Sequence, residues 1–228
     1  MKIFLTSICL LLVAPGFIHA DVLLKVKNED GAITQIMSNG KKARINMAPE
    51  PGYILYDYDK KTMHVVMPEE NKVMDMTRPS TPETDAKNKV KVSLTKLGSG
   101  EKIAGYHTQK YTLKANGKNC GTIYGSQAAL KNPEITQLFT GLQEMAKSQN
   151  SMMGGLSLSQ DACQRADMEL STYVKTLGIP LRSLDINGAM TSDVVSIDTK
   201  VTLSANNFAL PKNSPISSIE EEMKRLQR

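Results

Sequence analysis

The sequence has no tryptophan and few histidine, cysteine or phenylalanine residues. Its 228 residues include only 3 His, 3 Cys and 4 Phe. A structural zinc site needs several Cys or His ligands at close spacing, and no CxxC motif or zinc-finger His pair provides them. A phosphate loop with its Lys-Ser or Lys-Thr pair is missing as well, which argues against nucleotide binding. We therefore expect no metal and no cofactor.

Long hydrophobic runs are also missing. The apolar run at residues 3–13 is followed by a Pro-Gly pair, and the small Ala20 precedes the polar Asp21. A membrane anchor needs about 20 continuous apolar residues, so this run is too short to be one. The pattern predicts a secretory signal peptide over residues 1–20, cleaved near Ala20. Cys9 lies inside the apolar run and is not expected to carry a lipid.

Two cysteines remain in the mature chain, Cys120 and Cys163. In an exported chain they would meet an oxidising compartment, where an isolated pair usually forms a disulfide. On the chain-entropy model this bond would contribute about 4 kcal/mol. A redox-active pair is the less favoured alternative, because catalytic cysteines generally lie close in sequence. We expect a disulfide and a periplasmic location.

Nucleophilic catalysis would need a Ser or Cys beside a positioned base. The only histidines of the mature chain are His64 and His107, and neither lies in a nucleophile motif. His64 falls between two aspartates of the predicted sheet, which a surface cross-strand pair explains without catalysis. We predict no catalytic residue and no enzyme. An enzyme of unrecognised type, with these histidines as candidates, remains an alternative.

The mature chain, residues 21–228, is predicted to form a single α+β domain of strands, helices and strands again. Residues 77–89 contain two Pro and nothing apolar larger than Ala, which favours a surface loop over a domain boundary. Helical spacing of apolar residues predicts a helical insertion over 132–177, with helices at 133–147 and 160–177. A capping box predicts a terminal helix over 217–227.

Three turn signals divide the strands. The Asn-Gly pair at 39–40 predicts a two-residue hairpin turn that pairs Ser38 with Lys41. Turns are also predicted at 115–117 and at 187–188, each containing Asn-Gly. The sequence therefore indicates a largely antiparallel sheet.

The densest pattern is a three-stranded meander between residues 53 and 76. The predicted register places Tyr58 opposite Met63 and sends His64 to the other face. The apolar side chains then share one face, which is a candidate surface for a hydrophobic ligand. Its members are Ile54, Tyr56, Tyr58, Met63, Val65, Met67, Met74 and Met76.

The methionines of this face allow three interpretations. The chain has 13 Met, and thioethers are soft, flexible and apolar. They could form a plain core, an adaptable surface for a lipid or another hydrophobic ligand, or a Cu(I) site. Met63, Met67 and Met76 could converge on copper, but His64 points away and no dense MxxM cluster extends the pattern. Plain core and ligand surface are favoured.

Five short motifs follow one another along the mature chain. They are YILYD at 53–57, MHVVMP at 63–68, KIAGY at 102–106 leading to Tyr111, LGIPL at 177–181 and FALP at 208–211. Taken in this order, they look like uncharacterised exported bacterial domains that resemble the LolA-like superfamily. The resemblance implies a strongly curved antiparallel sheet, an unclosed barrel, with helices over its concave side and an apolar cavity between them. Better-known members of that superfamily carry lipoproteins or sense lipidated partners in the periplasm, and no catalytic residue is carried over.

These observations predict a periplasmic, non-enzymatic binding module for a hydrophobic ligand or a lipidated partner. The partner would be a lipid, an acyl chain or a lipoprotein. The formal net charge of +5 is spread along the chain, which argues against nucleic acid and could favour an anionic membrane surface. The alternatives are a structural or interaction protein with a Met-filled core and, less favoured, a copper-binding protein. The oligomeric state stays open.

Overall fold

The computed structural model describes residues 21–49, 51–77, 90–152, 161–219, 221 and 224, without the side chains of 147–152 and 171. The predicted signal peptide lies outside the described residues. So do the predicted loop at 77–89, apart from Thr77, and most of the predicted terminal helix. No helix in the described ranges is both long and apolar enough to cross a membrane.

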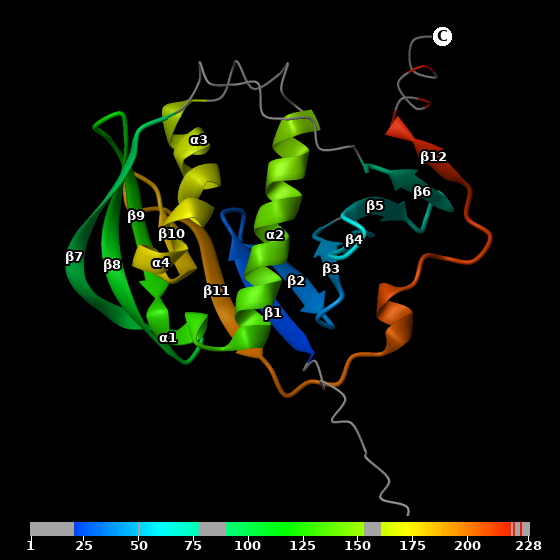
Figure 1. Cartoon of the computed structure of the whole chain (residues 1–228), viewed down its shortest axis with the longest axis horizontal. Coiled ribbons are helices and arrows are strands. Elements are labelled where there is room, and N and C mark those ends of the chain that lie inside the picture. Colours follow the sequence, from blue (N-terminus) through cyan, green and yellow to red (C-terminus); the bar gives the residue numbers. More distant parts are fainter. Residues whose placement is uncertain are drawn as a thin grey trace, which may run out of the picture.

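Twelve strands form one sheet in the order β12-β6-β5-β4-β3-β2-β1-β11-β10-β9-β8-β7. Neighbouring strands are antiparallel, except that β12 runs parallel to β6. Figure 1 shows the sheet curling around the helices. The strands are β1 (Val22–Asn28), β2 (Ile33–Ser38), β3 (Lys42–Met47), β4 (Gly52–Asp57), β5 (Thr62–Met67), β6 (Lys72–Asp75), β7 (Val92–Ile103), β8 (Tyr106–Ala115), β9 (Lys118–Ser126), β10 (Ile179–Leu184), β11 (Met190–Asp198) and β12 (Ile216–Ser218).

The helices cover the concave side of the sheet. Figure 1 shows α2 in front of β1 and β2, and α3 and α4 in front of the strands β8 to β10. A curled, largely antiparallel sheet with helices on one side is the α+β architecture predicted from the sequence. The helices are α1 (Gln127–Leu130), α2 (Pro133–Met152), α3 (Ala162–Glu169) and α4 (Val174–Leu177), with short 3-10 helices η3 (Leu170–Tyr173) and η4 (Ala205–Phe208).

The helix α2 begins where the sequence predicts. The Asn132 side chain accepts a hydrogen bond from the Ile135 amide at 3.0 Å, as an N-cap does. The predicted helix at 160–177 is instead divided into α3, η3 and α4. In the 3-10 helix η3, whose turns are tighter than those of an α-helix, the Tyr173 hydroxyl donates to the Val92 carbonyl at 3.0 Å. This hydrogen bond joins η3 to the sheet.

Two predicted strand registers are wrong by two residues. Ser38 pairs with Ala43 rather than Lys41, because the Asn39 side chain accepts the amides of Lys41 and Lys42 and widens the turn. Likewise Met63 pairs with Tyr56 rather than Tyr58. A shift by two preserves the face of every side chain, since strand side chains alternate. The eight residues of the predicted ligand face therefore still share one face.

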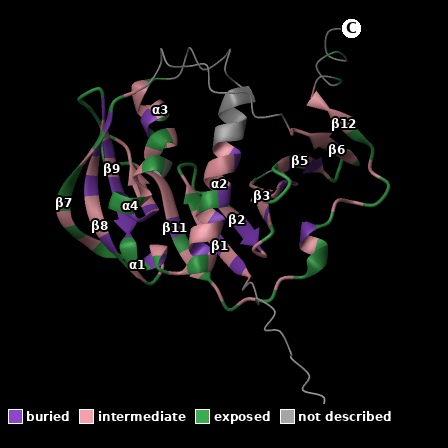
Figure 2. Cartoon of the chain, in the orientation of Figure 1, coloured by how far each residue is buried: buried purple, intermediate pink, exposed green. Residues whose placement is uncertain are grey.

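Three buried clusters hold the layers together (Figure 2). The largest joins α2, through Ile135 and Leu138, to the concave face of the strands from β1 to β5 and to β10 and β11. A second lies between α3, α4 and the strands β7 to β9. The third lies on the opposite face of β4 to β6, because its Tyr53 and Leu55 alternate with Ile54 and Tyr56 of the first cluster.

The predicted disulfide is confirmed. Cys120 of β9 and Cys163 of α3 are bonded, with their Cα atoms 5.2 Å apart. Both residues pack against the second cluster. The bond therefore fixes α3 to the sheet at one side of the concave face.

The C-terminal segment crosses the outer face of the sheet before it joins the edge as β12. Phe208 of η4 is buried, and Leu210 packs against the third cluster. The Arg44 guanidinium of β3 donates to the Asn207 carbonyl at 3.3 Å and lies 3.6 Å from the centre of the Tyr53 ring. We call residues 199–215 the strap.

Candidate functional site

A cavity of about 320 Å³ lies between the concave face and the helices. Its floor comes from β1, β2, β10 and β11, and its roof from α2 and the junction of α3 with η3. It is therefore formed where the central strands are covered by helices on two sides. The lining residues are Leu24, Val26, Ile36, Phe139, Leu142, Asp167, Leu170, Pro180, Ser183, Thr191, Ser192 and Val194.

One part of the lining is apolar. Leu24 pairs with Ile36, and Val26 pairs with Val194, so these side chains form two adjacent rows on the concave face. The period of two along β1 places Leu24 and Val26 on the same side. Across the cavity, α2 contributes Phe139 and Leu142. An apolar group placed here would lose contact with water on several sides.

The other part of the lining is polar. Ser183 and Ser192 are paired across β10 and β11, close to the turn that joins these strands, and Thr191 lies beside them. Asp167 of α3 also lines the cavity, opposite these strands. Three hydroxyls and one carboxylate therefore belong to the lining of a largely apolar cavity.

Asp167 is the charged residue of the lining. Burial and, to a lesser extent, the Asp161 carboxylate raise the pKa of Asp167 to about 6. Asp167 is nevertheless exposed to solvent, which places it at the rim of the cavity. Water at the rim screens the carboxylate and keeps the energetic consequence of this shift small.

A second hollow lies on the other side of Phe139, between α2, α4 and β10. Its volume is about 120 Å³, and Val174 and Ile179 also line it. Small-molecule sites usually occupy about 300–1,000 Å³. The larger cavity is therefore the candidate site.

None of the eight residues of the predicted ligand face lines the cavity. Met63, 1% exposed, and Tyr56 are buried in the cluster that contains α2, and Ile54, Tyr58 and Met76 pack against it. Val65, Met67 and Met74 are half-buried farther along the same face. The face is thus partly core, and ligand binding by its remaining side chains stays a prediction.

Tyr58 packs directly against α2. Its hydroxyl is 3.0 Å from the Ser38 hydroxyl, and burial raises the pKa of Tyr58 to about 12. Gly141 of α2 faces the ring, and a Cβ there would overlap it. The Gln137 side chain donates to the Gly40 carbonyl at 2.5 Å one turn earlier. This side of α2 is closed by direct contact.

The histidines do not meet at a site. His64 pairs with Asp75 of β6 and Leu55 of β4, on the face opposite Met63. His107 is exposed on β8. Over the described parts of the chain, no three His, Cys, Asp or Glu side chains are grouped so that they could hold a metal.

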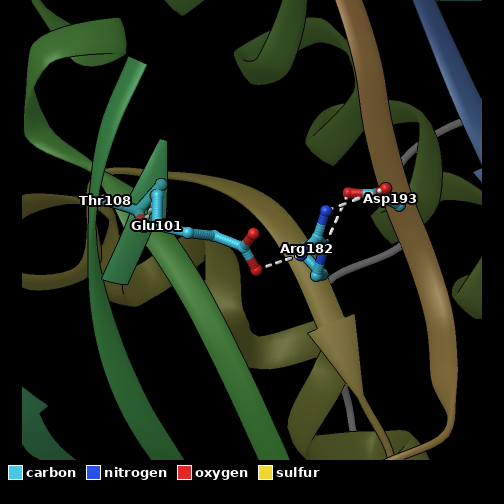
Figure 3. A network of polar contacts seen from close by, with 4 residues as sticks. All are labelled: Glu101, Thr108, Arg182 and Asp193. Carbon is cyan, nitrogen blue, oxygen red and sulfur yellow. Dashed lines mark hydrogen bonds and ion pairs between the residues drawn. The ribbon is translucent and has the colours of Figure 1, made fainter. Parts of the chain in front are cut away.

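Figure 3 shows a charged network that joins Glu101, Arg182 and Asp193. Arg182 of β10 binds both carboxylate oxygens of Asp193, at 2.7 and 3.0 Å, and also contacts Glu101 of β7. The hydrogen bond to Asp193 raises the pKa of Arg182, which stays cationic. Arg182 precedes Ser183 on the strand and therefore points away from the cavity. The network joins strands rather than forming part of the binding site.

Sequence reasoning identified parts of the cavity but not the cavity itself. Phe139, Leu142 and Leu170 belong to the predicted apolar stripes of the helices. Asp167 was missed, although it lies one turn after Cys163 and one turn before Leu170, beside an apolar stripe. A carboxylate beside an apolar helix stripe could have indicated that Asp167 lies at the edge of a binding site.

A family model described as a domain of unknown function, DUF4412, matches residues 22–214. The chain belongs to the DUF4412 family. All cavity-lining residues, from Leu24 to Val194, lie inside the DUF4412 match. No curated protein matches the sequence.

Several solved structures resemble this DUF4412 chain at low identity. An uncharacterised conserved protein from Thermus thermophilus is 10% identical, with a TM-score of 0.46 over 88% of this chain and 91% of that one. PNGF-II is 11% identical, with a TM-score of 0.40 over 91% of this chain and 33% of that one. MucB is 6% identical, with a TM-score of 0.36 over 86% of this chain and 58% of that one.

Proposed function

We propose that this domain is an exported, non-enzymatic binding module for a hydrophobic ligand, such as a lipid acyl chain or the lipid anchor of a lipoprotein. The observation that carries the proposal is the cavity of about 320 Å³ between the concave sheet and the helices. Seven of its lining residues are aliphatic or aromatic side chains other than proline, contributed by five different elements. Burial of apolar ligand surface against them supplies the driving force.

The volume of the cavity limits the size of the ligands that can bind. A volume of about 320 Å³ lies near the lower end of the range of small-molecule sites, about 300–1,000 Å³. It suits one short acyl chain, or the end of a longer one, rather than two chains side by side. The predicted ligand face on the other side of α2 is a separate surface, since Tyr58 and Gly141 close the sheet against the helix between them.

Export is part of the proposal. The bond between Cys120 and Cys163 is of the kind that persists in oxidising compartments. The predicted signal peptide over residues 1–20 and this disulfide together favour the periplasm. A periplasmic location would bring the cavity into contact with membrane lipids and lipoproteins, the partners that the sequence analysis favours.

The proposal is tested first on the protein purified from the periplasm. Organic extraction followed by mass spectrometry should release a copurified lipid, and the stripped protein should bind the apolar fluorescent probe 1-N-phenylnaphthylamine. Absence of both the lipid and probe binding would falsify the carrier function.

Two neighbouring residues of β11 give a matched pair of variants. Val194 is 5% exposed and lines the cavity, whereas Val195 is 42% exposed and does not line it. Val194→Phe should fill the cavity and lower probe affinity at least tenfold, and Val195→Phe should leave it unchanged. Equal affinities for the two variants contradict binding at this site. If Val194→Phe fails to fold by circular dichroism, Val26→Phe fills the same cavity from a half-buried position.

A further inference from the structure

The polar residues of the cavity lining are open to a ligand. Within the described part of the chain, the Asp167 carboxylate has neither a hydrogen-bond donor nor an ion-pair partner, and the hydroxyls of Ser183, Thr191 and Ser192 have no side-chain hydrogen bond. Asp167 is exposed and the three hydroxyl residues are half-buried, so water can meet their hydrogen-bonding capacity when no ligand is bound. A polar group of a ligand can take the place of that water.

The charge of the cavity lining is of one sign. Among the described residues that line the cavity there is no Lys, Arg or His, and Asp167 carries the charge. The charge that acts on Asp167 is another carboxylate, Asp161, just before the start of the same helix. The elements that face Asp167 across the cavity contribute Ser183, Thr191 and Ser192, which are neutral. A cation at the rim would be attracted, and an anion would be repelled.

We propose, building on the function above, that the cavity selects single-chain amphiphiles whose head group is a protonated amine. The amine donates to the Asp167 carboxylate at the rim and to the hydroxyls of Ser183 and Ser192, which line the same cavity. The alkyl chain lies on the apolar part of the lining, between β1 and α2. The arrangement combines burial of the chain with a charge-assisted hydrogen bond at its end.

The geometry favours this class over fatty acids. A free carboxylate head group placed at the same rim would lie beside Asp167 and would be repelled at neutral pH. An alcohol of the same chain length could use the hydroxyls but would gain no ion pair. The three head groups should therefore bind in the order amine, alcohol, carboxylate.

The experiment compares three ligands of equal chain length, namely dodecylammonium, dodecanol and dodecanoate, below their aggregation limits at pH 7.5. Displacement of 1-N-phenylnaphthylamine from the full mature chain gives each affinity. The wild-type chain should bind dodecylammonium at least tenfold more tightly than dodecanoate. Asp167→Asn should weaken dodecylammonium binding about tenfold, because the charge-assisted bond is lost, and leave dodecanol unchanged.

A variant on the same helix controls for general charge. Glu169 is exposed on α3 and does not line the cavity, so Glu169→Gln should leave all three affinities unchanged. Equal binding of dodecylammonium by the wild-type chain and Asp167→Asn overturns this inference, while dodecanol binding would still support the proposed function. Failure of all three ligands to bind overturns both.

Discussion

Asp167 lines the cavity and also affects the stability of the folded protein. Its carboxylate lies at the rim of an apolar cavity without a partner among the described residues, and burial raises its pKa. An ionised group in such a place is tolerated at a cost to the folded state. Proteins often accept such costs at binding sites, where the missing partner comes from the ligand.

The unliganded protein should therefore respond to pH through this residue. The folded pKa of about 6 lies above the ordinary value of 3.8, so the folded state binds the proton more tightly and stability falls as the pH rises through this window. Asp167→Asn should then be more stable than the wild-type chain at pH 7, and this gain in stability should be smaller at pH 4. The gain should be below about 1 kcal/mol, because water at the rim screens the charge.

Urea unfolding of both chains at pH 4 and pH 7 measures this difference. The Glu169→Gln variant, exposed on the same helix, should show no such dependence. A gain that is the same at both pH values would contradict the raised pKa of Asp167.

Single residues with a strong local preference were the easiest to predict from the sequence. Asn132 caps α2 at its predicted start, and Cys120 bonds Cys163, the pair that remains once the predicted signal peptide is set aside. Asn39 was placed in a turn correctly, but its side-chain hydrogen bonds made the turn longer than its Asn-Gly motif indicates. The Asn-Gly motif predicts where the turn lies, but the length of the turn depends on the hydrogen bonds of the Asn39 side chain.

At the scale of elements, the approach of α2 to the sheet depends on a small residue. Gly141 lies against the Tyr58 ring, where any side chain would meet it. Tyr58 is held in place by its contact with the Ser38 hydroxyl. The absence of a side chain at Gly141 thus allows α2 to close one side of the concave face.

Gly141→Ala should destabilise the protein even though alanine is the better helix former. Alanine would contribute about 1 kcal/mol through helix propensity. Overlap with the half-buried Tyr58 ring should outweigh this and cost about 1–3 kcal/mol net. Urea unfolding measures the change. Thr140→Ala, at the exposed neighbouring position, should stay within about 0.5 kcal/mol; a stabilised Gly141→Ala variant would show that the contact is loose.

The sequence predicted whether a segment is a strand or a helix more accurately than it predicted how the strands pair. Alternation along β4 to β6 gave the correct faces, because a shift of two residues leaves them unchanged. It could not give the register, which depends on how many residues each turn holds. The division of the second predicted helix at η3 was also missed, because the Tyr173 bond to Val92 connects segments far apart in the chain.

At the scale of the whole molecule, the strap stabilises the outer face. Phe208 is 4% exposed, and Leu210 covers Tyr53, Leu55, Val66 and Val73. Without this segment, the third cluster would face water. The strap therefore adds a partial second layer to the sheet, on the side opposite the helices.

Phe208→Ala should lower the free energy of unfolding by about 3 kcal/mol, as expected for removing a buried ring. Asn206→Ala, two residues earlier and exposed, should have little effect. Urea unfolding of both variants tests this. A loss below about 1 kcal/mol for Phe208→Ala would mean that the strap rests on the sheet without stabilising it.

Long-range pairing was the part that the sequence could not supply. The strand β1 was not predicted, although Val22, Leu24 and Val26 alternate with other residues. The parallel pairing of β12 with β6 takes up residues 216–218, where a terminal helix was expected to begin at 217. The described residues just beyond, Ile219, Glu221 and Lys224, are helical, and Ser218 and Glu221 make the capping contacts. Such pairings depend on which distant strands meet, and no local pattern encodes that.

The pairing of β1 with β11 also sets an order of events for an exported chain. The first strand to reach the far side of a membrane would find its β11 neighbour only after nearly all of the remaining chain had followed. Until then one edge of β1 would stay open, and the floor of the cavity could not form. Contacts between such distant segments fold slowly and expose strand edges meanwhile. If the domain is exported as proposed, its folding should therefore finish after translocation, and a chaperone that shields β1 would be of most use in that interval.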